Sequence, residues 1–192
     1  YSVSAVKGNK ANGNVTITVG TTTMTLSGNI ILVASGSGYN PSYSTGVKAD
    51  GDIIVSNGNI TIQATANAKG AKGFSADGNI TVDNGNITVT NAGTGATYTN
   101  TLGTLDSYSA AAFSSDINLT INGGTVTTTN SGTGGKGLKA DGIITIGTVA
   151  SSPTLNITTT GARFLTSGTD YNHPKAMVAT GAIIINNGNN TL

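Results

Sequence analysis

Four aspartates occupy the same place in a phrase that the chain repeats and that is clearest as KADG. They are Asp50, Asp77, Asp116 and Asp141. If the repeats stack as neighbouring strands, successive carboxylates lie about 5 Å apart, and like charges so placed repel each other. Each aspartate can relieve the repulsion by capping its own turn and facing water. Alternatively, the column can bind calcium, which takes oxygen ligands from carboxylates and carbonyls.

Further oxygen ligands lie close to the column in the sequence. Asp52 follows Asp50 by two residues, and Asn79 takes the same place after Asp77. The candidate metal ligands are therefore Asp50, Asp52, Asp77, Asp116 and Asp141, with calcium as the candidate cofactor. The alternative, in which the aspartates only shape turns, stays open.

The repeated phrase holds three short apolar runs separated by turn residues. In residues 46–62 the runs are 47–49, 53–55 and 60–62, with Asp-Gly and Asn-Gly between them. These dipeptides tolerate the positive φ of tight turns. Strands of three residues cannot form a sheet alone, but each can pair with its equivalent in the next repeat of a solenoid.

Copies of the phrase begin at Ala5, Gly46, Gly73, Ala112, Gly137 and Ala176. We therefore expect residues 1–192 to form one all-β domain, a single-stranded, right-handed parallel β-helix with three sides and about six coils. In the first copy, Val6 aligns with Val47, which puts Asn9 in the place of Asp50. A β-sandwich is the alternative, but it gives no reason for the same turn dipeptides to recur in phase. A second column, of asparagines, is expected to join the coils: Asn57, Asn84, Asn122 and Asn186.

Most insertions follow the third strand of a repeat and therefore emerge at one corner. They span residues 35–45, 65–72, 91–111, 130–136 and 161–175, and residues 147–153 form an exception at another corner. Insertions on one face of a solenoid often mark its binding face. Tyrosines and cations gather in them, and lysines also point outward from the first strand. The candidate carbohydrate-binding residues are Lys48, Lys139, Lys72, Lys175, Tyr43, Tyr108, Tyr171 and Arg163. The alternative for the tyrosines is that they pack the insertions onto the solenoid.

Composition excludes several classes of protein. Only 9% of residues are charged and the net charge is +1, which argues against a nucleic-acid partner. No apolar run approaches the roughly 18 residues of a membrane span, and the absence of cysteine rules out disulfides and thiolate chemistry. Because the sequence begins at Tyr1, we expect it to be part of a longer secreted protein.

The sequence gives little support for the catalytic residues of a polysaccharide lyase or hydrolase. Removing the α-proton of a uronate requires a base, and Lys48 and Lys139 lie three coils apart on the expected first strand. Asp50 and Asp116, two coils apart, come close to the carboxyl separation of an inverting hydrolase. Nothing places an acid and a base in distinct environments, so we do not expect an enzyme.

The phrases GVKADGDI, GFSADGNI, GLKADGII and PKAMVATGAI resemble a bacterial surface family of carbohydrate-binding domain-containing proteins. The resemblance covers most of residues 46–192 and extends weakly to the rest. It implies a right-handed parallel β-helix similar to that of pectate lyases, which binds calcium and acidic plant polysaccharide without established lyase activity. By position, Asp50, Asp77, Asp116 and Asp141 match the calcium ligands, although Ile117 replaces the glycine after Asp116.

The main functional hypothesis is a secreted or bacterial cell-surface module. It would bind an acidic plant polysaccharide such as polygalacturonate, with calcium, at the first sheet and the adjoining loops. A polysaccharide lyase or hydrolase is one alternative. A structural adhesin or stalk without a metal is the other.

Overall fold

Parallel strands stack into three sheets in the computed structural model, which describes residues 7–18, 20–26, 31–35 and 38–192. The first sheet contains β1 (Lys7–Ala11), β6 (Thr45–Ala49), β9 (Lys72–Ala76), β14 (Ala111–Ser115), β17 (Lys136–Ala140) and β22 (Lys175–Ala179). The second contains β2 (Val15–Ile17), β7 (Ile53–Val55), β10 (Ile80–Val82), β15 (Leu119–Ile121), β18 (Ile144–Ile146) and β23 (Ile183–Ile185). The third contains β3 (Thr21–Leu26), β8 (Asn59–Ala64), β11 (Asn86–Asn91), β16 (Thr125–Asn130), β19 (Thr154–Thr159) and β24 (Asn189–Thr191).

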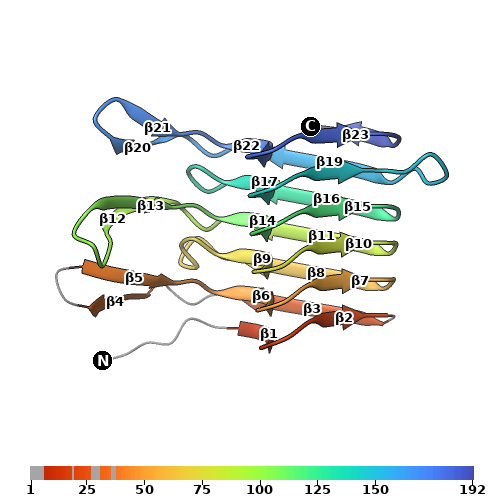
Figure 1. Cartoon of the computed structure of the whole chain (residues 1–192), viewed down its shortest axis with the longest axis horizontal. Helices are drawn as coiled ribbons and strands as arrows, with labels where there is room; N and C mark the ends of the chain where they lie inside the picture. The colour runs from red at the N-terminus through yellow and green to blue at the C-terminus, as the bar shows by residue number, and fades with distance from the viewer. Residues whose placement is uncertain (1–6, 19, 27–30, 36–37) are drawn as a thin grey trace.

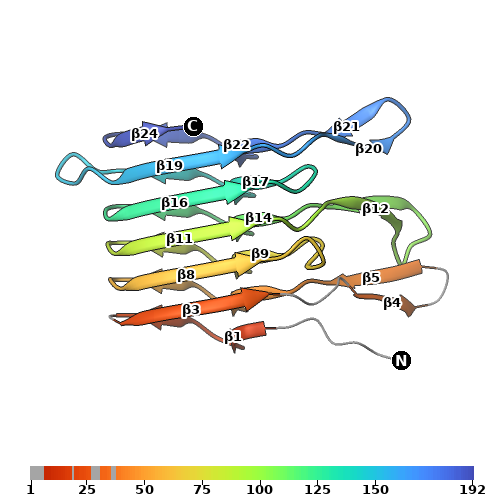
Figure 2. The same ribbon diagram turned by 180° about the vertical axis from the view of Figure 1, so that it is seen from behind.

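Each coil contributes one strand to each sheet, so six coils stack along one axis (Figures 1 and 2). We number the coils 1 to 6 in chain order, with β6, β9, β14, β17 and β22 opening coils 2 to 6. The predicted three-sided parallel β-helix is therefore confirmed, and the β-sandwich is rejected. The described residues form no helix, and hence none that could cross a membrane.

The core follows from the alternation of inward and outward side chains. In β7 the side chains of Ile53 and Val55 are fully buried, and Ile54 between them is partly exposed. Because coils 2 to 5 repeat this pattern in the second sheet, equivalent side chains stack along the axis. Phe74 and Phe113 are neighbours in the first sheet, with ring centroids 4.6 Å apart and planes only 6° apart. Stacked aromatic rings of this kind contribute both buried area and ring–ring attraction.

The register of coil 1 differs from the prediction by three residues. β1 pairs Asn9 with Val47, Lys10 with Lys48 and Ala11 with Ala49. Asn12 therefore takes the place that had been assigned to Asn9, and Val6 lies outside the described residues. The correct alignment is visible in the sequence, because Lys10 to Asn14 reads KANGN where residues 48–52 read KADGD.

Three β-hairpins project from the corner between the third and first sheets (Figure 1). They are formed by β4 (Ile31–Ser35) and β5 (Gly38–Ser42), by β12 (Ala96–Thr99) and β13 (Leu105–Tyr108), and by β20 (Phe164–Ser167) and β21 (Asp170–Asn172). The predicted corner is confirmed, although the first hairpin begins before Ser35. Residues 147–153 lie between β18 and β19, at the other corner expected for them. The β12–β13 hairpin contacts both β5 and β20, so the hairpins form a continuous wall.

The predicted asparagine column divides into two pairs, Asn57 with Asn84 and Asn122 with Asn186, that are offset by one residue. Pairing of Val82 with Ile121 aligns Asn122 with Asp83 rather than with Asn84. Asn122 Nδ2 donates to Asp83 Oδ1 at 2.9 Å, and Asn57 Oδ1 accepts the N–H of Gly58 in its own turn. A ladder of side chains between coils does exist, but it runs through Asn14, Asp52, Asn79 and Asn118 at the corner between the first and second sheets.

Candidate functional site

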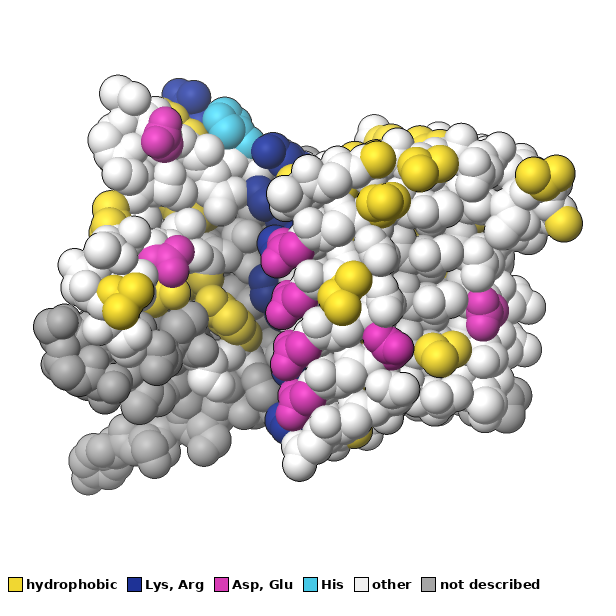
Figure 3. Space-filling model, in the orientation of Figure 1, with side chains coloured by type: hydrophobic (Ala, Val, Ile, Leu, Met, Phe, Trp, Pro, Cys, Tyr) yellow, Lys and Arg dark blue, Asp and Glu magenta, His cyan; other side chains and the backbone are white. Residues whose placement is uncertain are grey.

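A groove of about 560 Å³ lies between the outer face of the first sheet and the wall of hairpins. Five of the predicted carbohydrate-binding residues line it: Lys48, Lys72, Lys139, Tyr43 and Tyr108. Figure 3 shows the groove as a hollow that crosses the coils, with lysines inside it and a column of acidic side chains along one edge. The groove therefore runs along the solenoid axis, perpendicular to the strands that form its floor.

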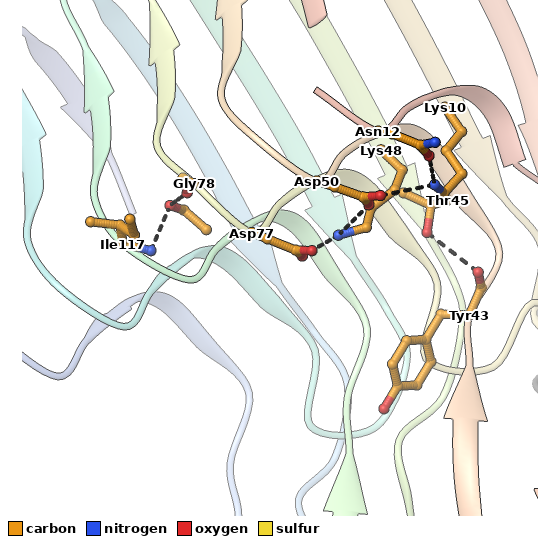
Figure 4. Close-up of polar contacts among 10 residues, drawn as sticks. Lys10, Asn12, Tyr43, Thr45, Lys48, Asp50, Asp77, Gly78 and Ile117 are labelled. Carbon is orange, nitrogen blue, oxygen red and sulfur yellow. Dashed lines mark hydrogen bonds and ion pairs between the residues drawn. The ribbon is translucent and has the colours of Figure 1, made fainter. Parts of the chain in front are cut away.

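The aspartate column is largely neutralised by lysines of the first sheet. Lys48 Nζ lies between the carboxylates of two successive coils, 3.8 Å from Asp50 Oδ1 and closer to Asp77 Oδ1 (Figure 4). Lys10 Nζ contacts Asp50 Oδ2 at 3.0 Å, and Lys139 Nζ contacts Asp141 Oδ1 at 2.6 Å. The hydrogen bond from Lys10, aided by Lys48, lowers the pKa of Asp50. Because these side chains are partly exposed, each pair stabilises the fold only slightly.

Asp116 differs from the other three aspartates. No lysine or arginine among the described residues forms an ion pair with it. Lysines at this outward position pair with the aspartate of their own coil or of the next one, but coil 4 and the preceding coil have Ser114 and Ser75 there. Partial burial, together with Asp77 and Asp141, raises the pKa of Asp116. Coil 4 therefore carries the least compensated negative charge in the groove.

The described aspartates do not form a compact cluster of acidic side chains. Within the described part of the chain, no three acidic or histidine residues lie close enough together to hold a metal ion. Asp52 belongs to the ladder at the next corner, where its Oδ1 accepts the backbone N–H of Asn79 at 2.6 Å and the Asn79 side-chain amide at 3.1 Å. Calcium takes six to eight oxygens, whereas a lysine ammonium stands between Asp50 and Asp77. The calcium site stays a prediction of the sequence.

Two further lysines lie in the groove without a carboxylate partner. Lys72 Nζ donates to the carbonyl of Ser109 at 2.7 Å and lies 5.4 Å from the centre of the Tyr43 ring. Lys136 is 6% exposed, and its Nζ donates to Asn172 Oδ1 and to the carbonyl of His173. Neither ammonium forms a salt bridge with a described aspartate.

Burial changes the protonation of both lysines. It lowers the pKa of Lys72 to about 7, and the charges of Lys139 and Lys136 act in the same direction. The Lys72 side chain is partly exposed and lines the groove. Burial lowers the pKa of Lys136 to about 8, with a smaller effect from Lys175. Desolvated cations without a counter-ion favour the arrival of an anion.

Lys136 was not among the predicted binding residues. Its position is nevertheless visible in the register, which places it in one column with Lys72, Ala111 and Lys175. The signal in the sequence is a lysine that lies three residues before the outward-pointing residue of the same strand, as Lys136 lies before Lys139.

The tyrosines both pack the wall and line the groove. The rings of Tyr43 and Tyr108 lie 5.9 Å apart, above the short loop that contains Gly70. Gly70 has φ +65°, and a Cβ there would lie 2.6 Å from the Tyr43 ring and 2.9 Å from the Tyr108 ring. Only glycine allows this approach. Burial raises the pKa of both tyrosines, so both remain neutral hydroxyl groups.

Three predicted binding residues lie outside the groove. Arg163 stacks on the ring of Tyr171, with its guanidinium carbon 3.9 Å from the ring centre. Both residues belong to the β20–β21 hairpin and its approach, and Tyr171 is 42% exposed. Lys175 continues the column of Lys72 and Lys136 onto coil 6, where it is exposed. None of the three lines the groove.

Comparison with protein families gives a match over more than half of the chain. Residues 27–152 match the family of carbohydrate-binding domain-containing proteins. The chain belongs to this family. The matched residues include the groove floor from Thr45 to Lys139, and the family description supports carbohydrate binding and favours a role without catalysis. No curated protein and no solved structure matches the chain.

Proposed function

We propose that the groove binds an acidic polysaccharide, with Lys72 and Lys136 receiving its carboxylates. The observation that carries the proposal is the pair of buried ammonium groups without a salt bridge on the floor of an open, elongated groove. Polysaccharide carboxylates would lie over these cations, and the hydroxyls of Ser75 and Ser114 would hydrogen-bond the sugar. The rings of Tyr43 and Tyr108 would face its apolar side.

Charge explains why an acidic glycan fits better than a neutral one. A hydrogen bond to a charged group contributes about 1.5–3 kcal/mol, compared with about 1 kcal/mol between neutral groups. A neutral sugar would leave both ammonium groups desolvated and uncompensated, which costs free energy. We further propose that the chain acts outside the cell or at its surface, where such polymers occur.

A lyase is the second candidate, because one observation favours it. Lys72 has a pKa of about 7 in the groove, and a lysine of this kind is suited to general-base catalysis. As the neutral amine, Lys72 would take the proton from C5 of a uronate while Lys136 faced the carboxylate. The electron pair would form the C4–C5 double bond, and the glycosidic oxygen would leave C4 and take a proton from water. Incubation with polygalacturonate that yields unsaturated, shortened products would establish this activity. Unchanged polymer length would support the binding role.

Calorimetry with polygalacturonate and with its fully methyl-esterified form tests the proposed function. We expect the acidic polymer to bind at least about tenfold more tightly, because only it can pair with the lysines. Binding should weaken as salt is added and should survive a chelator. Equal affinity for both polymers would refute the proposal. Loss of binding in the chelator would instead support the calcium bridge predicted from the sequence.

A further inference from the structure

Positive charge alternates along the groove floor. The register places Lys72 on coil 3, Ala111 on coil 4 and Lys136 on coil 5 in a single column. Coil 4 has no lysine in either outward column, since Ser114 occupies the other position. Its only charged groove residue is Asp116, which has no ion-pair partner among the described residues. The groove thus presents a cation, a negative position and a second cation in succession.

We propose that this groove selects glycans that carry a carboxylate on alternate sugars, with charged sugars at coils 3 and 5 and an uncharged sugar at coil 4. This proposal rests on the proposed function and specifies its ligand class. Polymers built from a uronic acid and a neutral sugar in strict alternation have this pattern. A polymer charged at every sugar does not.

The spacing of the coils supports this assignment. Neighbouring parallel strands lie about 4.8 Å apart, so Lys72 and Lys136 are separated by roughly 10 Å along the axis. One sugar of an extended glycan advances by about the rise of one coil, so every second sugar lies opposite a lysine. A glycan lying along the groove therefore keeps the same register with the lysines over three sugars.

Coil 4 distinguishes an uncharged sugar from a charged one. A carboxylate there would lie near the Asp116 carboxylate, and the buried Ala111 offers it no cation. Lys48 and Lys139, the nearest outward lysines, are already paired with Asp77 and Asp141. Like charges brought together without a counter-ion weaken binding. An uncharged sugar avoids this repulsion and can use the hydroxyl of Ser114.

Three hexasaccharides with one galacturonate backbone test the proposal without changing the sugar. One is fully acidic, one is methyl-esterified on every second residue, and one is fully esterified. We expect the alternately esterified form to bind the intact chain about three- to tenfold more tightly than the fully acidic form, because it places no charge beside Asp116. The fully esterified form should bind most weakly. Tighter binding of the fully acidic form would overturn the proposal but leave the proposed function intact. If neither acidic form binds better than the fully esterified one, the proposed function itself fails.

Asp116→Asn provides an independent test, because it removes the negative charge at coil 4 and keeps the shape of the side chain. We expect it to improve the affinity for the fully acidic hexasaccharide by about three- to tenfold. Affinity for the alternately esterified form should change by less than about twofold. Asp170→Asn is the matched control, since Asp170 lies on the β20–β21 hairpin outside the groove lining and should leave both affinities unchanged. An unchanged ratio of the two affinities in the folded Asp116→Asn protein would contradict the proposal.

Discussion

Replacing Lys72 and Lys136 together by methionine is expected to weaken binding to polygalacturonate by about a hundredfold or more. Each ammonium is expected to contribute a charge-assisted hydrogen bond of about 1.5–3 kcal/mol, and every 1.4 kcal/mol changes affinity about tenfold. Methionine keeps the aliphatic stem that fills the space beneath the hairpins. It also removes the cost of burying a charge, so the fold should persist. Calorimetric titration gives the affinity, and a thermal melt verifies folding.

Lys69→Met is the matched control for this pair. Lys69 is exposed on the short loop after β8 and lies outside the groove lining, so the change removes a nearby positive charge without altering the floor. We expect its affinity to stay within about twofold of the unsubstituted chain, because exposed charges are screened. A folded double variant that binds as tightly as the Lys69→Met control would contradict the role given to the two lysines.

Affinity for acidic polysaccharide is also expected to fall steeply as the pH rises from about 6 to about 9. The pKa is about 7 for Lys72 and about 8 for Lys136 in the free chain. A bound carboxylate stabilises the protonated amines and raises both values, so binding takes up protons above these pKa values. Affinity is therefore highest at about pH 6 and below, where both amines are protonated. Above it, affinity falls by up to about tenfold per pH unit for each lysine that has lost its proton.

Other charged side chains act on each of the two lysines, so the pH dependence needs a control. Lys139, Lys136, Asp116 and Asp141 act on Lys72, and Lys175 acts on Lys136. Substituting one lysine at a time assigns each step of the pH dependence to its amine. Lys72→Met should remove the lower step and keep the upper one. A flat affinity between about pH 6 and about pH 9 in the unsubstituted chain would show that neither amine meets the ligand.

Much of the fold could be predicted because it depends on local patterns. Asp-Gly and Asn-Gly turns in phase with residues such as Ile53 and Val55 leave few arrangements other than stacked coils. The register of coil 1 was wrong because two overlapping phrases, one beginning at Val6 and one at Lys10, both resemble the repeat. Only pairing with β6 distinguishes them, and the pairing selects Lys10.

Less of the site than of the fold could be predicted from the sequence, because the site depends on contacts between coils and between insertions. The columns identified Lys48 and Lys139 as outward residues, and both line the groove. Lys48 bridges the carboxylates of two coils, and this contact removes the repulsion on which the calcium prediction was based. No periodicity in the sequence reveals this contact. The burial of Lys136 likewise depends on Asn172 and His173 from a distant hairpin. Arg163 instead stacks on Tyr171 within its own hairpin, and neither residue lines the groove.

A structure of the chain with an acidic hexasaccharide tests the central claim most directly. We predict that the glycan lies along the groove across coils 3 to 5, with one carboxylate within hydrogen-bonding distance of Lys72 Nζ and another within that distance of Lys136 Nζ. A glycan bound outside the groove would contradict the account, for example one stacked on Tyr171 and Arg163. So would a glycan in the groove whose carboxylates reach the aspartates through a metal ion and leave both lysines uncontacted.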